Sequence, residues 1–448
     1  MKLLKGKGNM IKLNPAQILV IGFGSLILIG TCLFMLPIAT HEEGRGLSFI
    51  DALFEATSAV CVTGLAVVDT GSTFTLFGQI VLLCLIQMGG WGFMTTGIFM
   101  YIILGKRIGL KERLLLQDSL NVFSLSGVVH LVKRIILITL LVELIGAIIL
   151  SIRWSFEMPL KKAIYYGIFH SISAFNNAGF GLEPDSLSKW VGDPTVNIVI
   201  TLLFIIGGIG FTVILDLFRK KSFQKLSLHT KVALLMTLIL NIVGTLIIFA
   251  TEYDNAKTFG NFGLADKLWA SYFQGVVPRT AGFNTIDISQ MTSSSQVFMM
   301  ALMFIGASSG STGGGIKVTT YAIIMFAFWT VLTNRNDVNI FRRRISWQYV
   351  NRALSIVVAA IIFIFIIFFL LTYTEKAEMS KILFETISAF GTVGLTAGLT
   401  PDLTPIGRIL ITIMMFIGRL GPLTMAFAIL KTQKEAKVRF AEEKILIG

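Results

Sequence analysis

Four short turns along the chain share one pattern of small, uncharged residues that includes glycine. Backbone carbonyl oxygens in such turns can replace the hydration shell of a bare potassium ion without a fixed charge. Glycine suits this use because it lacks a Cβ atom, adopts positive φ angles and lets chain segments approach closely. None of the turns contains Asp or Glu, which disfavours a ring of carboxylates. The predicted ion-binding residues are Val62, Thr63 and Gly64; Asn177, Ala178 and Gly179; Thr280, Ala281 and Gly282; and Thr392, Val393 and Gly394.

A longer segment around each turn repeats as well. Residues 53–65, 168–180, 271–283 and 383–395 align without a gap and place the four glycines in one column. The stretch before each glycine has roughly 12–14 residues, which is too short to span a bilayer but fits a re-entrant helix. Irregular backbone at membrane depth is tolerated only where it is buried or lines water. We therefore expect the turns to meet around one aqueous axis, with helix C-termini whose dipoles favour a cation.

The composition places these elements in a membrane. The chain has 448 residues, of which 54% are hydrophobic and only 14% charged, and its mean hydropathy is +0.79. Apolar windows at residues 18–36, 135–152, 232–250 and 354–371 are long enough to cross about 30 Å of hydrocarbon. We predict an all-α polytopic membrane protein with eight spanning helices and four re-entrant pore helices. These form four helix–pore helix–helix repeats in pseudo-fourfold arrangement around one pore.

The distribution of charge predicts the topology. Most of the 38 Lys and Arg residues cluster in the N-terminus and in alternate loops, so these segments and both termini are expected in the cytoplasm. The predicted units are residues 1–104 (N-terminal segment and repeat 1), 105–220 (repeat 2), 221–333 (repeat 3, with a broken second span), 334–430 (repeat 4) and 431–448 (cytoplasmic tail). The absence of eukaryotic targeting features favours a bacterial plasma membrane. No cytoplasmic segment is long enough for a regulatory domain of its own.

The second apolar span of the third repeat is interrupted by the run GASSGSTGGG at residues 306–315. Each glycine in a helix interior costs about 1 kcal/mol, so we predict an irregular loop in the middle of the membrane. Such a loop can move at small steric cost and fits a gate below the turns. A phosphate-binding loop is disfavoured, because Ile316 separates the last glycine from the lysine. The predicted gate residues are Gly310, Ser311, Thr312, Gly313, Gly314, Gly315, Lys317 and Arg419.

Two of these residues, Lys317 and Arg419, are charges within or beside apolar spans, where charges are costly and usually face the protein interior or water. The five donors of Arg419 suit carbonyl oxygens of the loop, so it is predicted to stabilise a closed gate. Repulsion of ions and simple packing are the alternatives. Arg279, directly before the third turn, is assigned a structural role rather than a transport role. Glu55 and Glu385 are expected on the pore helices as structural or outer-mouth groups.

The four repeats, the sequence TVGL at residues 392–395 and the run at residues 306–317 resemble the Trk/Ktr/HKT superfamily of potassium transporters, most closely the Ktr membrane subunit. The resemblance covers nearly the whole chain. It implies that the four glycines line a selectivity filter, with Gly64 as the potassium-favouring residue of the first repeat. It also implies a homodimer, each protomer with its own pore, on a cytosolic ring of nucleotide-binding regulatory subunits.

We expect this chain to bind no cofactor besides the transported potassium, and no nucleic acid. Whether sodium is coupled or acts as an activator stays open, as does the nucleotide that the partner binds. The segments available to a regulatory ring are residues 106–113, 219–231, 335–344 and 431–448, with simple solvation as the alternative.

The second functional hypothesis is a sodium-coupled secondary transporter of another small solute, which also uses broken helices. Parallel repeats, four in number, favour the pore instead. An enzyme is disfavoured because the four histidines are scattered and make no ligand pattern.

Overall fold

The computed structural model describes residues 15–41, 44–92, 95–97, 99, 128–220, 222–429, 441 and 443. Most of this part is helical, and one type of long apolar helix recurs along it. Each of these helices is long and apolar enough to cross a membrane, and together they match the four apolar windows predicted above. They are α1 (Pro15–Phe34), α7 (Val128–Trp154), α11 (Leu228–Glu252) and α15 (Trp347–Thr374).

A shorter helix follows each long one. The short helices have 13 or 16 residues, which at 1.5 Å per residue is about 20–24 Å and less than the hydrocarbon thickness. Each packs against the long helix that precedes it, and each is followed by one of the predicted glycine turns. They are α2 (Phe49–Cys61), α8 (Leu160–Phe175), α12 (Leu264–Val276) and α16 (Met379–Gly391).

The helices that come after the turns are α4 (Leu76–Trp91), α9 (Pro194–Ile209), α13 (Ser293–Phe304) and α17 (Pro405–Leu420). Each begins at a side-chain cap, because Thr75, Asp193, Thr292 and Thr404 accept hydrogen bonds from N–H groups of the first turn. A long helix, the short helix after it and the helix after the turn together make one helix set, and the chain has four such sets in order. In the third and fourth sets a buried glutamate from the end of the long helix fixes this cap. Glu252 accepts from the N–H of Thr292 at 2.9 Å, and Glu375 from that of Thr404 at 3.0 Å.

Two of these helices lead into sharp bends that were not predicted from the sequence. α9 meets α10 (Phe211–Arg219) at 94°, and α17 meets α18 (Pro422–Ile429) at 98°. The bends lie at Gly210 and Gly421, whose φ angles of 97° and 88° no helix can contain. α4 likewise ends at Gly92, with φ 82°. The predicted break in the third set separates α13 from α14 (Val318–Leu332).

A small β-hairpin between α14 and α15 departs from the expected all-α fold. Its strands, β1 (Val338–Ile340) and β2 (Arg343–Ile345), pair antiparallel. Phe341 and Arg342 both have positive φ angles, as a two-residue hairpin turn of type I′ requires. The sequence here lacks the Asn-Gly or Asp-Gly pair that usually announces this turn, so the hairpin was not foreseen.

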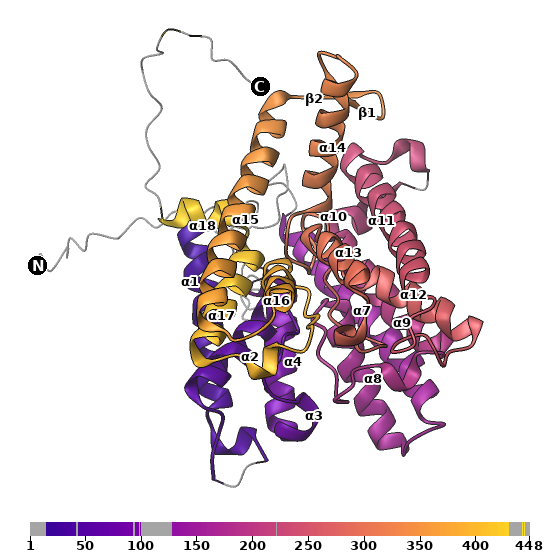
Figure 1. Cartoon of the computed structure of the whole chain (residues 1–448), viewed down its shortest axis with the longest axis vertical. Coiled ribbons are helices and arrows are strands. Elements are labelled where there is room, and N and C mark those ends of the chain that lie inside the picture. The colour runs from indigo at the N-terminus through magenta and orange to yellow at the C-terminus, as the bar shows by residue number, and fades with distance from the viewer. Residues whose placement is uncertain are drawn as a thin grey trace, which may run out of the picture.

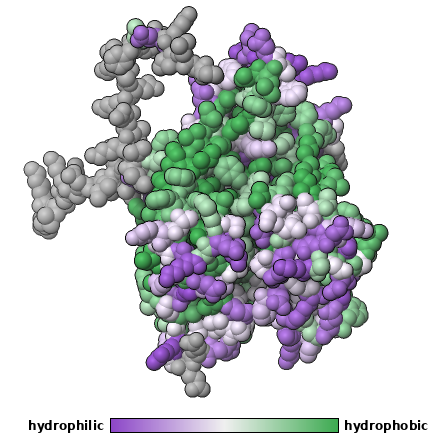
Figure 2. All heavy atoms as spheres, viewed as in Figure 1, coloured by the Kyte–Doolittle hydropathy of each residue, from purple (hydrophilic) through white to green (hydrophobic). Residues whose placement is uncertain are grey.

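The four helix sets close on themselves in space. α17 of the last set packs against α2 of the first, and α1 packs against α18, so indigo and yellow segments lie side by side in Figure 1. Apolar side chains gather in a broad band over the surface, with hydrophilic residues toward both ends of the molecule (Figure 2). The exposed apolar residues include large side chains of α7 and α15, such as Leu144 and Phe365. This distribution is typical of a membrane protein.

Candidate functional site

The four predicted glycines meet in a closed ring. Gly64, Gly179, Gly282 and Gly394 have φ angles of 91°, 72°, 77° and 90°. A Cβ atom added to Gly64 would lie 3.1 Å from the Cα of Gly179, and one added to Gly179 would lie 2.6 Å from the Cα of Gly282. A Cβ atom added to Gly394 would lie 3.1 Å from the Cα of Gly282 and 3.0 Å from that of Gly64. Only glycine allows four backbones to approach this closely.

The residue before each glycine turns its carbonyl oxygen toward a neighbouring segment of the ring. The oxygen of Ala281 would lie 3.0 Å from a Cβ atom added to Gly179, and that of Val393 would lie 2.7 Å from one added to Gly282. The oxygens of Thr63 and Ala178 approach Gly394 and Gly64 in the same way. Carbonyl oxygens from all four segments therefore gather at the ring, and such oxygens can replace the water around a cation.

The residue two positions before each glycine also has left-handed backbone. The φ angles of Val62, Asn177, Thr280 and Thr392 are 56°, 61°, 69° and 49°. Three of these residues are β-branched, for which positive φ is a strained conformation that costs on the order of 1–3 kcal/mol. Strain of this kind persists where function requires it. The same left-handed backbone in all four segments points to a shared demand on carbonyl direction.

Two buried glutamates hold the chain on the far side of the glycine turns. Glu55 accepts a hydrogen bond from the N–H of Val67 at 2.8 Å, and Glu385 accepts one from the N–H of Ala397 at 3.1 Å. Both carboxylates thus bind backbone after the turn, which gives them a structural role. His170 takes the same place in the second repeat and is fully buried.

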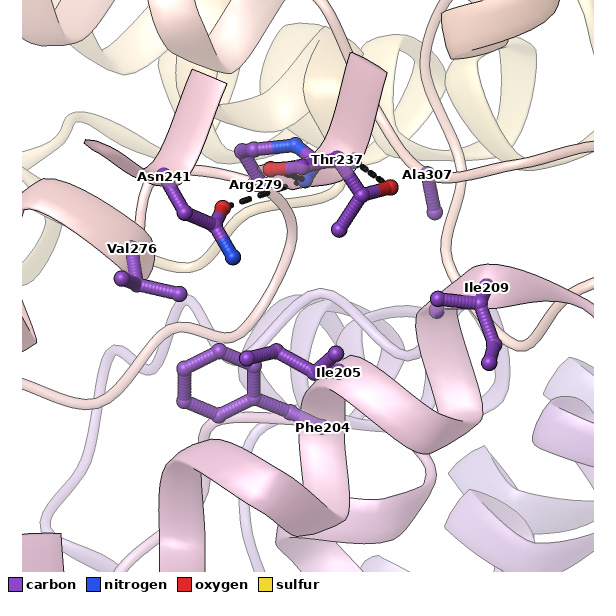
Figure 3. Close-up of a pocket in the computed structure, with 9 residues that line it drawn as sticks. Phe204, Ile205, Ile209, Thr237, Asn241, Val276, Arg279 and Ala307 are labelled. Carbon is purple, nitrogen blue, oxygen red and sulfur yellow. Dashed lines mark hydrogen bonds between the residues drawn. The ribbon is translucent and has the colours of Figure 1, made fainter. Parts of the chain in front are cut away.

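Arg279 points away from the glycine ring toward α11. Its guanidinium donates to the carbonyl oxygen of Thr237 at 3.3 Å, to the hydroxyl of Thr237 at 3.2 Å and to Oδ1 of Asn241 at 3.1 Å. Figure 3 shows these groups beside a small cavity of about 10 Å³, which is room for about one water molecule. Its walls include Phe204, Ile205, Gly208, Ile209, Val276 and Ala307.

The loop predicted to be a gate lies against the strained positions of two glycine turns. The hydroxyl of Thr312 donates to Oδ1 of Asn177 at 2.7 Å, and the N–H of Gly314 donates to the hydroxyl of Thr392 at 3.0 Å. The loop closes on itself where the N–H of Gly306 donates to the carbonyl oxygen of Ile316 at 2.9 Å. The loop and the ring are thus joined directly.

The loop is also attached to the bends of the second and fourth sets. The carbonyl oxygen of Gly310 accepts the N–H of Phe211 at 2.9 Å, at the first residue of α10. The N–H of Gly315 donates to the carbonyl oxygen of Gly418 at 3.3 Å. Ser311 stays within the loop, where its hydroxyl donates to the carbonyl oxygen of Ser308 at 2.6 Å. The loop is therefore hydrogen-bonded to both bent helix pairs.

The positively charged side chains of Lys317 and Arg419 both bind carbonyl oxygens of the loop. Nζ of Lys317 donates to the oxygen of Gly313 at 2.7 Å. The guanidinium of Arg419 donates to the oxygens of Thr312 and Gly89, and so ties the loop to the end of α4. The structure thus brings the predicted ion-binding and gate residues together in one continuous site.

Sequence reasoning missed one element of this site, a recurring G-x-x-G pattern at residues 89–92, 207–210 and 418–421. The last glycine of each is the positive-φ residue at which the helix ends, as described above. The first packs on the last turn of the preceding short helix, where a Cβ atom would collide with a carbonyl oxygen. The contacting pairs are Gly89 with Val60, Gly207 with Phe175 and Gly418 with Phe390. The recurrence in three second helices was visible in the sequence.

Comparison with known proteins places this geometry in context. A family model described as "TrkH: Cation transport protein" matches residues 13–438. The chain is 50% identical over 438 residues to the Ktr system potassium uptake protein B of Bacillus subtilis (strain 168), covering 98% of each chain. It is 42% identical over 445 residues to the protein of the same name in Vibrio alginolyticus, covering 99% of this chain and 97% of that one.

Another relative, described as potassium/sodium uptake protein NtpJ of Enterococcus hirae, is 38% identical over 443 residues and is covered over 98% of both chains. Among solved structures, the potassium transporter TrkH from Vibrio parahaemolyticus matches with a TM-score of 0.73. This match covers 96% of the present chain and 87% of that chain at 18% identity, and it establishes the fold.

Proposed function

Because the chain belongs to the TrkH family of cation transport proteins, we propose that it takes up potassium across the bacterial plasma membrane through a channel-like selectivity filter. The observation that carries this proposal is the closed ring of Gly64, Gly179, Gly282 and Gly394, which carbonyl oxygens of all four segments approach. Relatives named potassium uptake proteins support the choice of ion.

The filter consists of the four segments that lead into the ring. When a potassium ion enters, carbonyl oxygens replace the water of its hydration shell. These are the oxygens of Thr63, Ala178, Ala281 and Val393, which carry partial rather than full negative charge. The C-termini of α2, α8, α12 and α16 precede these segments, so the helix dipoles favour a cation there. Strained backbone at the positions two residues before each glycine keeps the oxygens directed at the ion path.

The loop at residues 306–315 is the gate in this proposal. Lys317 and Arg419 hold its carbonyl oxygens, and Thr312 and Gly314 join it to the filter. Breaking these hydrogen bonds releases the loop from the ion path. The attachments to Phe211 and Gly418 allow movement at the bends of the second and fourth sets to open it.

We assign the helix sets to four repeats with the boundaries predicted from the sequence, which gives eight spanning and four pore helices in pseudo-fourfold arrangement. Four long helices support this assignment, as do two bent pairs that each have the length of one span. The positive-inside rule orients both termini toward the cytoplasm.

As the family resemblance implies, we propose a homodimer that works with a cytosolic ring of nucleotide-binding regulatory subunits. The name of the Enterococcus hirae relative, potassium/sodium uptake protein, supports the proposal that sodium also takes part in the transport. Of the expected docking segments, residues 106–113 lie outside the described residues, as does the tail at 431–448 apart from positions 441 and 443. Residues 335–344 include most of the hairpin, where Arg342 and Arg343 are exposed, whereas the exposed Arg344 pairs with Asp337 at 2.8 Å.

Growth at limiting potassium tests the proposal. A strain that lacks its own potassium uptake systems should grow when it carries this chain together with its regulatory subunit. Gly394→Asp should abolish the rescue, because a side chain at φ 90° would collide with the neighbouring segments. Gly44→Asp is the matched control, since Gly44 also has positive φ but no atom within 4 Å of an added Cβ. Equal growth with the Gly394 variant, or no rescue by the wild type inserted in the membrane, contradicts the proposal.

A further inference from the structure

In three of the four short helices, one backbone hydrogen bond joins the last helical turn to the residue before the glycine, and α12 lacks this equivalent bond. Ser58, Ser173 and Ser388 occupy one column of the repeat. The carbonyl oxygen of each accepts the N–H of the residue before the glycine, at 2.8, 2.8 and 2.9 Å, in the manner of a helix C-cap. In the third repeat this column holds Val276, and the N–H before the glycine, that of Ala281, bonds instead to Val277 at 3.1 Å.

The third repeat has a different support in Arg279. The equivalent positions in the other repeats hold Cys61, Asn176 and Gly391, none of which carries a charge. Arg279 directly precedes Thr280, the strained residue of the third segment, and its side chain makes three hydrogen bonds to α11. The planar guanidinium has a fixed fork geometry, so these bonds define the direction of the side chain. The backbone beside Thr280 is thereby tied to a long helix behind the filter.

Burial of the positive charge of Arg279 costs free energy. Arg279 is 7% exposed, and within the described part of the chain its partners are the neutral oxygens of Thr237 and Asn241 rather than a carboxylate. Its Nε has no partner there. A lone buried charge in a membrane protein is usually retained for function. The partial negative charge at the C-terminus of α12 offsets part of the cost.

Displacement of Arg279 would also disturb hydrogen bonds of the other filter segments. The hydroxyl of Thr280 accepts a hydrogen bond from Nδ2 of Asn177 at 3.4 Å, and Asn177 in turn binds the gate loop through Thr312. We infer that Arg279 is a positioning residue that sets cation discrimination, by fixing the third filter segment to α11 in place of the backbone C-cap bond of the other repeats. This inference rests on the proposed filter function.

The test measures potassium and sodium influx into liposomes that contain the purified full-length dimer with its regulatory subunit. Arg279→Lys keeps the charge but loses the fork, and Asn241→Leu removes one acceptor and leaves Arg279 intact. Each should lower the potassium-to-sodium selectivity ratio about fivefold or more, as expected for the loss of hydrogen bonds to a buried charge. Arg153→Lys and Asn351→Leu are matched controls remote from the filter, and should keep the wild-type ratio.

A wild-type ratio in folded Arg279→Lys protein overturns the inference, since charge alone would then suffice. If that variant does not fold, Asn241→Leu decides, and a wild-type ratio there overturns the inference equally. Gly64→Ser reports on the filter itself. If the selectivity ratio changes in Gly64→Ser but in neither Arg279→Lys nor Asn241→Leu, the proposed function stands and the role of Arg279 does not. Absence of potassium influx through the wild type contradicts both.

Discussion

The N–H of Gly314 donates a hydrogen bond of 3.0 Å to the side-chain oxygen of Thr392. This bond joins the intramembrane loop directly to a strained residue of the fourth filter segment, where φ is 49°. The position of the loop is therefore coupled to the geometry of the filter, and substitutions on either side should affect both.

Thr392→Val tests this coupling. Valine keeps the β-branched shape but removes the acceptor, so the loop loses about 1 kcal/mol of attachment. We expect basal potassium flux without the regulatory subunit to rise about fivefold. Thr386→Val is the control, because within the described residues the Thr386 hydroxyl bonds to its own helix alone, at Ile382 and 2.7 Å. Unchanged flux in folded Thr392→Val protein would separate the loop from the filter.

Arg419→Gln should open the gate more strongly. The change removes a half-buried guanidinium that binds the carbonyl oxygens of Thr312 and Gly89. Hydrogen bonds from charged donors contribute about 1.5–3 kcal/mol each, so we expect basal flux to rise tenfold or more in liposomes without the regulatory subunit. A well-folded variant with wild-type flux would leave Arg419 a packing residue.

Deletion of residues 311–313 should remove most of the gate. The deletion takes away Thr312, which bonds to Asn177 and accepts from Arg419. Flux should then become high and nearly independent of the regulatory subunit. Retained dependence on that subunit, in protein that still elutes as a folded species, would place the gate elsewhere.

Gly64→Ser should admit sodium. A Cβ atom at this position would lie 3.1 Å from the Cα of Gly179 and would push the first segment out of the ring. The ring then loses its close fit, and the ratio of potassium to sodium influx should fall. Gly24→Ser provides the control, since an added Cβ at Gly24 meets no atom within 4 Å. An unaltered ratio would argue against a filter role for the ring.

Gly418→Ala should destabilise the fold. A Cβ atom there would collide with the carbonyl oxygen of Phe390, in the last turn of α16. Overpacking of this kind costs about 1–3 kcal/mol, so the variant should melt at lower temperature than Gly24→Ala in the same detergent. Equal melting temperatures would mean that α16 and α17 can separate easily.

Much of this structure was accessible from the sequence because it depends on local composition. Apolar windows predicted the long helices, and the aligned glycine column predicted that the four glycines at positions 64, 179, 282 and 394 meet. The bends at Gly210 and Gly421 were missed, because a single glycine in an apolar run fits both a straight and a bent helix. The direction of Arg279 was also left open, since its acceptors on α11 lie about 40 residues away in the chain.

The most direct test of the filter is crystallographic. Crystals of the complex grown with rubidium or thallium in place of potassium should show anomalous density on the axis, within the carbonyl oxygens of Thr63, Ala178, Ala281 and Val393. Crystals of the Gly394→Asp variant should lack that density. Anomalous peaks that lie only outside the ring, in well-ordered wild-type crystals, would contradict the assignment of these four segments as the ion-binding site.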